Sequence, residues 1–193
     1  MNMLGKYKLI ALTLGSCLLL QGCAALLVGA GVGAASAAHD RRTLGTQVDD
    51  KTTASRISVA LGQNEGLKQR TNINVHVFNG STLLVGQAPS QALIAEVQQT
   101  VEKVKNIGKL HNQIRLASPI QTSTSAHDLW LASKIKTILV ADKRIDGLHV
   151  HVAVEDSEVF LMGLVSQNEA NIAVDIVRNV DGVAQVIKAF EYL

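Results

Sequence analysis

The stretch VHVAVEDSEVFLMG, residues 150–163, predicts a β-hairpin. Val150, Val152 and Val154 alternate with polar or small residues, as the inward-facing positions of a half-buried strand do. Asp156-Ser157 is a polar break typical of a turn, and Val159–Gly163 then supplies a second apolar strand. This hairpin is the part of the sequence from which the rest of the fold can be worked out.

A second copy of the hairpin lies earlier in the chain, as INVHVFNGSTLLVG at residues 73–86. Its turn is Asn79-Gly80, and its terminal Gly86 stands 77 residues before Gly163. The similarity continues outside the hairpin, because Ser55 corresponds to Ser133 at a spacing of 78. Such internal repetition predicts two domains of the same fold.

Each copy adds two helices and a third strand to its hairpin. Apolar residues at helical spacing predict a first helix over 50–61 and over 128–140. A second helix follows the hairpin, and Ser166 with Glu169 has the spacing of a capping box. Last strands are expected at 110–116 and 186–193, each reached by a right-handed crossover. We therefore expect an α+β fold of two tandem αββαβ units, each with two helices on a three-stranded mixed sheet.

The N-terminus predicts a lipoprotein signal. Lys6 and Lys8 precede an apolar run that ends in Leu20-Gln21-Gly22-Cys23, which resembles a bacterial lipobox. The expected parts are a signal peptide at 1–22, a tether at 23–45, a first domain at 46–116, a linker at 117–126 and a second domain at 127–193. A transmembrane helix is the alternative, but the segment after Cys23 is rich in Gly and Ala, which insert weakly.

Processing at Cys23 also bounds the chemistry of the mature chain. Cys17 leaves with the signal and Cys23 becomes an acylated thioether, so no disulfide, redox pair or cysteine metal site is expected. The chain has 18 basic and 16 acidic residues, and losing Lys6 and Lys8 brings the net charge near zero. A nucleic-acid ligand is not expected, because nothing indicates a clustered basic face.

The repeat resembles the BON domain. The residues that carry the resemblance are the Val159–Gly163 strand and the turn Val180-Asp181-Gly182-Val183. The first copy departs at that turn with Val104-Lys105-Asn106-Ile107, where Asn tolerates a left-handed backbone. Together with the lipobox and the lead-in at 46–50, the chain resembles the dual-BON outer-membrane lipoproteins.

That resemblance implies a non-catalytic protein without a cofactor, anchored by acyl chains such as palmitate in the periplasmic leaflet of the outer membrane. Ala24 after the lipidated Cys23 resembles an outer-membrane sorting signal. The resemblance further implies support of envelope integrity, enrichment at division sites, and binding of anionic phospholipids (phosphatidylglycerol, cardiolipin) through the first helix of the second domain. The alternative is a periplasmic adaptor for the outer-membrane assembly machinery or for cell-wall amidase activators.

The residues themselves point to the same helix. At about 100° per residue, the only Trp in the chain falls opposite the apolar positions that correspond to the core of the first copy. The expected lipid-binding residues are Trp130, Ser133, Lys134, Lys136, Thr137 and Val140. Trp suits the headgroup boundary and Lys attracts anionic headgroups.

Alternatives remain at this site. Trp130 could instead pack against the first domain, and Lys134 or Lys136 could simply be solvated. Lys143 and Arg144 could extend the basic patch. The corresponding face of the first copy, which includes Thr52, has no aromatic residue, so only the second domain is expected to meet lipid.

Catalytic and metal interpretations have less support. His149 and His151 share one predicted strand face and could hold a metal, but a polar face turned to solvent or to the other domain is the favoured interpretation. Asp49-Asp50 and Asp128 fit helix starts, and Glu155-Asp156 fits a turn. Because the sequence has no phosphate-binding loop or nucleophile elbow, neither an enzyme nor a metal site is predicted.

Overall fold

The computed structural model describes residues 40–119 and 122–193. The predicted signal peptide, Cys23 and nearly all of the predicted tether lie outside these residues. The first domain consists of α2 (Leu44–Gln63), α3 (Glu65–Arg70), β1 (Asn72–Phe78), β2 (Ser81–Ala88), α4 (Gln91–Glu102) and β3 (Leu110–Leu116). The second consists of α5 (Thr122–Ala141), the 3-10 turn η1 (Gly147–His149), β4 (His151–Glu155), β5 (Glu158–Val165), α6 (Gln167–Arg178) and β6 (Gln185–Tyr192).

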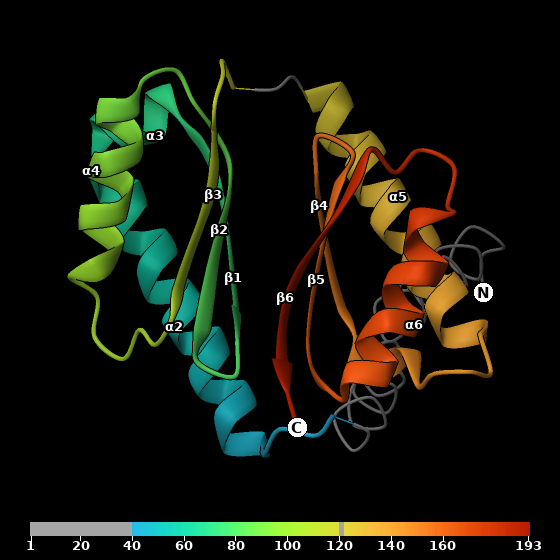
Figure 1. The fold of residues 1–193 in the computed structure, drawn as a ribbon. Coiled ribbons are helices and arrows are strands. Elements are labelled where there is room, and N and C mark those ends of the chain that lie inside the picture. Colours follow the sequence, from blue (N-terminus) through green and yellow to red (C-terminus); the bar gives the residue numbers. More distant parts are fainter. Residues whose placement is uncertain (1–39, 120–121) are drawn as a thin grey trace, which may run out of the picture. The chain divides into compact units, whose positions relative to one another are not determined.

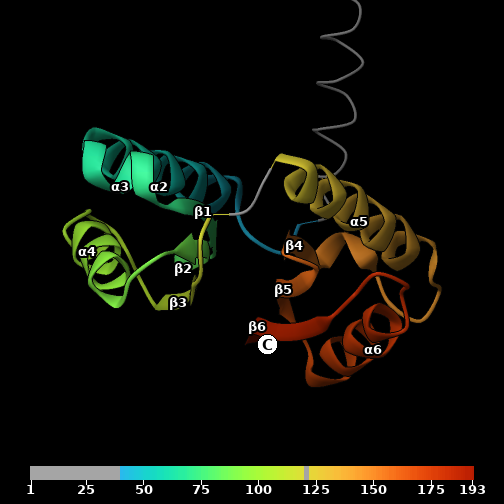
Figure 2. The same cartoon turned by 90° about the horizontal axis from the view of Figure 1, so that it is seen from above.

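Each domain has the predicted α+β architecture. Its strands follow the order β1-β2-β3 or β4-β5-β6. The first two strands pair antiparallel and the last two parallel, which confirms the mixed three-stranded sheet. Within each domain the helices lie on one face of the sheet, as Figures 1 and 2 show.

The hairpin turns form where the sequence predicts them. Asn79 and Gly80 have φ values of 50° and 77°, and Asp156 and Ser157 have 50° and 63°. Two successive left-handed residues match the right-handed twist of the paired strands. Asn106 also takes the left-handed conformation, with φ of 66°, in the position where the second copy uses Gly182.

Two helices begin earlier than the sequence indicated. α2 starts at Leu44, where Thr43 accepts a hydrogen bond from the Thr46 N–H as N-cap. α5 starts at Thr122, inside the segment expected to be a linker. Ser and Thr are polar and resemble a linker in the sequence, yet they are compatible with the first turn of a helix. The boundaries expected at 45/46 and 126/127 therefore do not coincide with the helix starts.

The short helix α3 was not predicted from the sequence. Asn64 caps it by accepting from the N–H groups of Gly66 and Leu67, and the helix buries Leu67 to 1% exposure. Only one of its six residues is buried in the core, so no apolar periodicity in the sequence indicates a helix there. The second domain has η1 at the matching place.

Both faces of each central strand are buried. Toward the helices, Leu84 packs with Val97 in the core of the first domain, and Leu161 packs with Ile135 in the core of the second. The opposite faces of β2 and β5 join in a third cluster, which includes Leu83 and Phe160. Burying a side chain the size of Phe160 stabilises the fold by about 2–3 kcal/mol. The two domains thus share an apolar interface made by their sheets.

Candidate functional site

The outer face of α5 exposes apolar side chains above a buried stripe. Leu131, Ile135 and Leu139 are fully buried, whereas Trp130 is 55% and Val140 50% exposed. Ser133 and Thr137 are exposed beside them. The indole therefore lies outside the core of residues 41–193, and the alternative in which it packs against the first domain is not what the structure shows.

The hydroxyl groups of this face are satisfied by their own helix. Ser133 Oγ donates to the Leu129 carbonyl at 3.0 Å, and Thr137 Oγ1 donates to the Ser133 carbonyl at 2.9 Å. A hydroxyl that already donates to its helix costs less when water is removed. Ser133, Thr137 and Val140 line a shallow hollow with Lys136. The surface is therefore suited to contact with an apolar phase.

Lys134 is held next to the indole. Its Nζ lies 5.1 Å from the centroid of the Trp130 ring, a cation–π distance, and donates to the Asp181 carbonyl at 3.1 Å. On the preceding turn of α5, the His127 ring lies 5.6 Å from the Trp130 ring. Lys134 was among the residues predicted from the sequence, whereas His127 was not, although it stands three residues before Trp130.

Lys136 is placed differently. Its Nζ donates to the carbonyls of Gly147 at 2.8 Å and Val150 at 2.6 Å, so the ammonium joins α5 to η1 and to the residue that precedes β4. Lys136 also lines the hollow beside Thr137 and Val140. The structure thus gives this ammonium a structural role.

Two further positions bear on the extent of the surface. Arg144 pairs with Asp142 at 2.8 Å and with Asp175 at 3.5 Å, and hydrogen bonding to Arg144 lowers the pKa of Asp142 to about 2. A cation bordered by two carboxylates adds little positive potential, so Arg144 does not extend the basic patch. Leu129, which was not among the predicted residues, is 72% exposed beside Trp130 in the sequence.

The prediction that His149 and His151 share a strand face is wrong. His149 belongs to η1, where it lies 3.5 Å from Asp146 and 3.8 Å from Glu169. His151 begins β4 and its ring lies 5.7 Å from that of His76, whose pKa is lowered by burial. Among the described residues no cluster of three or more His, Cys, Asp or Glu side chains is arranged to hold a metal.

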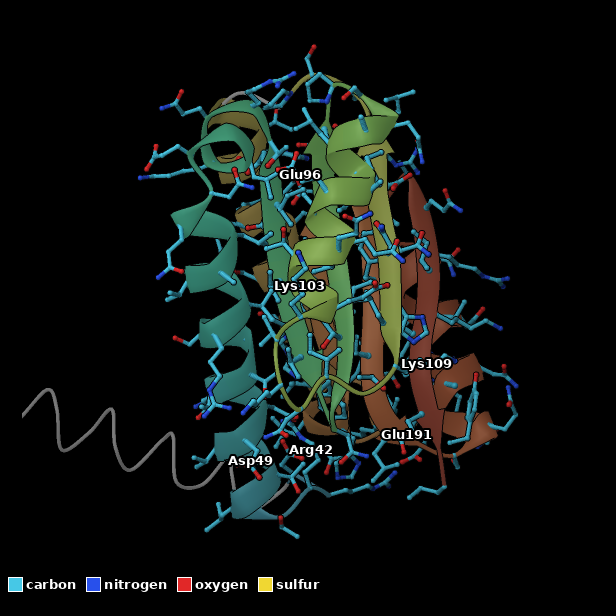
Figure 3. All side chains as sticks on the ribbon, turned by 90° about the vertical axis from the view of Figure 1, so that its left-hand side faces the viewer. Arg42, Asp49, Glu96, Lys103, Lys109 and Glu191 are labelled. Atoms are coloured by element: carbon cyan, nitrogen blue, oxygen red, sulfur yellow. The ribbon has the colours of Figure 1, made fainter. Side chains whose placement is uncertain are left out.

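Asp50 and Asp128 do not act at helix starts, which corrects the sequence interpretation. Asp50 is 4% exposed and accepts from the N–H groups of Asn79 at 2.7 Å and Gly80 at 2.8 Å. Asp128 is 5% exposed and accepts from Asp156 at 2.8 Å and from Ser157 at 3.0 Å. Each carboxylate therefore binds the hairpin turn of its own domain, a device repeated in both copies. Asp49 beside it stays on the exposed surface (Figure 3).

Glu155 is also more than a turn residue. It is 7% exposed, and its carboxylate accepts from the side-chain amides of Gln87 at 2.8 Å, Asn74 at 2.8 Å and Asn72 at 3.4 Å. All three donors belong to the first domain. This buried polar centre joins the two domains beside their shared apolar cluster.

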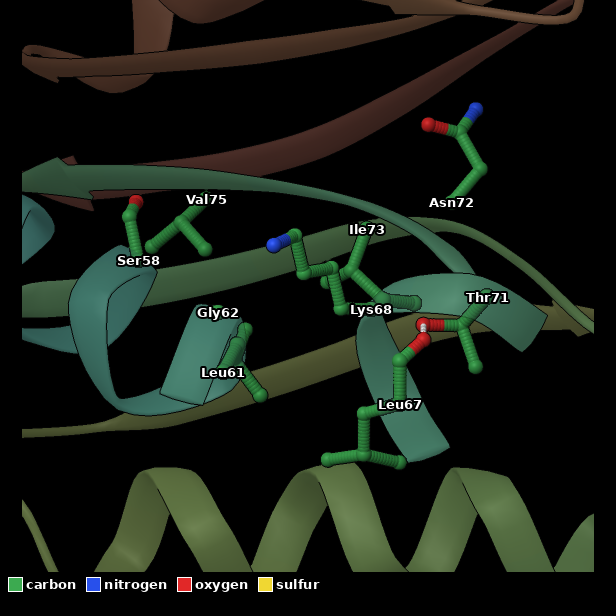
Figure 4. A pocket seen from close by; sticks show the side chains of 9 residues that line it. All are labelled: Ser58, Leu61, Gly62, Leu67, Lys68, Thr71, Asn72, Ile73 and Val75. Carbon is green, nitrogen blue, oxygen red and sulfur yellow. Dashed lines mark hydrogen bonds between the residues drawn. The ribbon is translucent and has the colours of Figure 1, made fainter. Parts of the chain in front are cut away.

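A small pocket lies between α2, α3 and β1 (Figure 4). Ser58, Lys68 and Thr71 line it together with the apolar residues Leu61 and Leu67. Ser58 is the repeat counterpart of Lys136, whose side chain crosses to η1 in the second domain. The shorter serine leaves this space open in the first domain.

Two arginines just before α2 connect this part of the chain to both domains. Arg42 pairs with Asp50 at 2.7 Å and lies 3.8 Å over the Phe78 ring. Arg41 donates to both carboxylate oxygens of Glu169, at 2.9 and 2.7 Å, and to the Leu164 carbonyl at 3.0 Å. The chain entering the first domain is thereby attached to the second.

The Arg41–Glu169 pair predicts a pH-dependent stability. Hydrogen bonds from Arg41 lower the pKa of Glu169 to about 2, against about 4.3 for a free glutamate. The pair therefore stabilises the fold above about pH 4.3 and loses its effect as the pH falls toward 2. Because both groups are partly exposed, we expect Arg41→Ala to cost about 1 kcal/mol at neutral pH. Urea unfolding should show the wild type and the variant converging as the pH is lowered; a constant difference would contradict this account.

No helix within residues 40–119 and 122–193 combines the length and apolarity needed to cross a bilayer. Comparison with known proteins then adds a family. The BON domain family matches residues 49–118 and 127–193.

Three curated proteins are similar over most of the chain. The "Outer membrane lipoprotein DolP" of Haemophilus influenzae is 35% identical, covering 98% of each chain. The "21 kDa hemolysin" of Actinobacillus pleuropneumoniae is 34% identical, covering 80% of this chain and 79% of its own. The "Osmotically-inducible protein Y" of Escherichia coli is 28% identical, covering 74% of this chain and 72% of its own.

Proposed function

Because this chain belongs to the BON-domain family and carries two copies of the domain, we propose that it is a non-catalytic outer-membrane lipoprotein that binds anionic phospholipid through α5. Cys23 would carry the acyl anchor on the periplasmic leaflet. The similarity to an outer-membrane lipoprotein over 98% of both chains supports the location. A role in envelope integrity, including at division sites, belongs to the same proposal.

The exposed indole on α5 is the observation that supports lipid binding. A Trp that is 55% exposed, beside Val140 at 50% and Leu129 at 72%, is costly to leave in water and favourable at the headgroup boundary. Lys134 beside the ring supplies positive charge for anionic headgroups. In the first domain the repeat counterpart of Trp130 is Thr52, whose hydroxyl donates to the Val48 carbonyl at 2.8 Å.

The test uses the mature chain with Cys23→Ser, so that an acyl anchor does not dominate binding. Trp130→Glu should weaken binding to phosphatidylglycerol vesicles at least about tenfold, because it removes the indole and adds a like charge. NMR shifts on adding anionic micelles should centre on α5. Thr52→Glu is the matched control, since it introduces the same residue at the equivalent position of α2.

Equal loss of binding in Thr52→Glu and Trp130→Glu would mean that added negative charge, and not the α5 surface, is responsible. Wild-type spectra that do not change with anionic lipid would overturn the proposal. Phosphatidylcholine vesicles serve as the uncharged comparison and should bind more weakly.

One observation favours the adaptor function as a second candidate. Leu44, Val48 and Val59 are 68%, 62% and 54% exposed on α2, and none of them is aromatic. Exposed apolar side chains of this kind suit a protein partner, such as the outer-membrane assembly machinery or an amidase activator. Crosslinking in envelopes discriminates the two functions: a partner lost in Val48→Glu but kept in Trp130→Glu would assign that role to α2.

A further inference from the structure

The pocket between α2, α3 and β1 is open because the first domain has smaller side chains than the second at two positions of its first helix. Ser58 stands where the second domain has Lys136, and Gly62 stands where it has Val140, both at a spacing of 78. Lys136 reaches across to η1, whereas a Cβ on Gly62 would have nothing within 4 Å. The first domain therefore leaves open a space that the second domain fills with its own side chains.

The pocket combines apolar side chains with one charged group. Leu61 and Leu67 are buried, and Ile73 and Val75 are half-buried beside them. Of the nine lining residues, all within the described part of the chain, Lys68 alone is charged. In Figure 4 its side chain extends from α3 toward α2, on the opposite side of the pocket. A ligand here would meet an apolar surface and one ammonium group.

The Lys68 ammonium is available to a ligand. Its Nζ lies 3.5 Å from Glu65, and the two side chains are 60% and 66% exposed, so the pair contributes little to stability. An ammonium has three donors and can bind a second anion while it faces Glu65. The hydroxyl groups of Ser58 and Thr71 already donate to main-chain carbonyls at 2.9 and 2.7 Å. Recognition of charge in this pocket therefore depends on Lys68.

We propose that this pocket binds a small aliphatic carboxylate, with the carboxylate on Lys68 and the aliphatic group against Leu61 and Leu67. The inference goes beyond the proposed function, because it gives the first domain a ligand of its own. A single ammonium matches the single charge of a carboxylate, whereas a phosphate with nearly two charges would need further donors.

The size of the pocket limits the ligand. Its volume is about 250 Å³, below the roughly 300–1,000 Å³ of sites that hold drug-sized molecules. The C-terminal residue of a peptide and a short free acyl chain both have the required chemistry, an aliphatic group that ends in a carboxylate.

The experiment is an NMR titration of the mature Cys23→Ser protein with N-acetyl-leucine, hexanoate, uncharged N-acetyl-leucinamide and inorganic phosphate. Both carboxylates should shift the amides of residues 58–62 and 67–75, with a dissociation constant of about 1 mM for so small a ligand. The amide should bind at least about fivefold more weakly, because it cannot form the charge-assisted hydrogen bond. Tighter binding of N-acetyl-leucine would support a peptide end as the source, and tighter binding of hexanoate an acyl chain.

Variants that copy the second domain test the pocket itself. Gly62→Val and Ser58→Lys introduce the residues of the second domain and should weaken binding at least about tenfold by filling the space. Lys68→Gln should weaken it about fivefold or more. Gly45→Val makes the same change at an exposed position of α2 outside the pocket, and Lys103→Gln removes an exposed lysine after α4. Both controls should bind as the wild type does.

Several results would overturn the inference. One is a Gly62→Val protein, folded by circular dichroism, that binds both carboxylates like the wild type. Another is equal weakening by Lys68→Gln and Lys103→Gln, which would reduce the effect to overall charge. Binding of N-acetyl-leucinamide as tightly as the acid, or of phosphate alone, would contradict the carboxylate. Because Lys68 is on the surface, Lys68→Gln still tests the site if Gly62→Val does not fold.

Discussion

Asp50→Ala is expected to lower the free energy of unfolding of the first domain by about 3–5 kcal/mol, the cost of breaking a buried ion pair. The carboxylate accepts two turn N–H groups at 2.7 and 2.8 Å and pairs with Arg42 at 2.7 Å. Removing it leaves donors without this acceptor in a place where water has little access. Arg42 also loses a partner, although it keeps its contact with the Phe78 ring.

Urea unfolding followed by circular dichroism gives the free energy, and hydrogen exchange at the amides of Asn79 and Gly80 locates the effect. Asp49→Ala is a matched control: it removes the neighbouring carboxylate, which is exposed, and should change stability by less than about 0.5 kcal/mol. Equal effects of Asp49→Ala and Asp50→Ala, or unchanged amide exchange, would show that the hydrogen bonds from the turn to Asp50 do not stabilise the domain.

The same substitution in the second domain tests the repeat. Asp128 binds a turn in which both Asp156 and Ser157 have positive φ without being glycine. Such residues cost stability unless their surroundings hold them. In the second domain, Asp128 therefore contributes to stability by holding a strained turn. In the first domain, Asp50 contributes in the same way and also through its ion pair with Arg42.

The strands, turns and helix faces could be predicted from the sequence because each leaves a local pattern. Alternation marked the hairpins, Asn79-Gly80 marked a left-handed turn, and the helical wheel separated Trp130 from Ile135. These features depend on residues close together in the chain. Their agreement in both copies reinforced each single prediction.

The functions of Asp50, Glu155 and Lys136 could not be predicted in the same way. Their partners lie on other elements, and for Glu155 in the other domain, at separations of 68 to 83 residues. For Asp50, a position near the expected helix start was already a sufficient local explanation. Nothing in the sequence therefore indicated its hydrogen bonds to the hairpin turn. Likewise, the reach of Lys136 to η1 depends on a turn that has no apolar periodicity of its own.

Gly86→Ala is expected to destabilise the first domain by at least about 3 kcal/mol, the range of severe backbone and packing defects. Gly86 lies in β2 with φ of +123°, a region that residues with a Cβ rarely adopt. A Cβ there would lie 1.9 Å from the Asn72 carbonyl oxygen and 2.9 Å from its carbon. Because these are backbone atoms at the start of β1, no side-chain rotation can relieve the clash, and the pairing of β1 with β2 must shift.

Gly62→Ala provides the comparison, because nothing lies within 4 Å of the Cβ it would add. In a helix that change should be neutral or stabilising by up to about 1 kcal/mol.

Thermal unfolding and vesicle binding, measured on both variants, separate the stability of the first domain from lipid binding by the second. Gly86→Ala should lower the melting temperature, while a folded second domain should still bind lipid through α5. A Gly86→Ala protein as stable as the wild type would mean that β1 and β2 do not approach each other as described. Conversely, loss of lipid binding with the second domain intact by NMR would show that the shared sheet interface, and not α5 alone, maintains the binding surface.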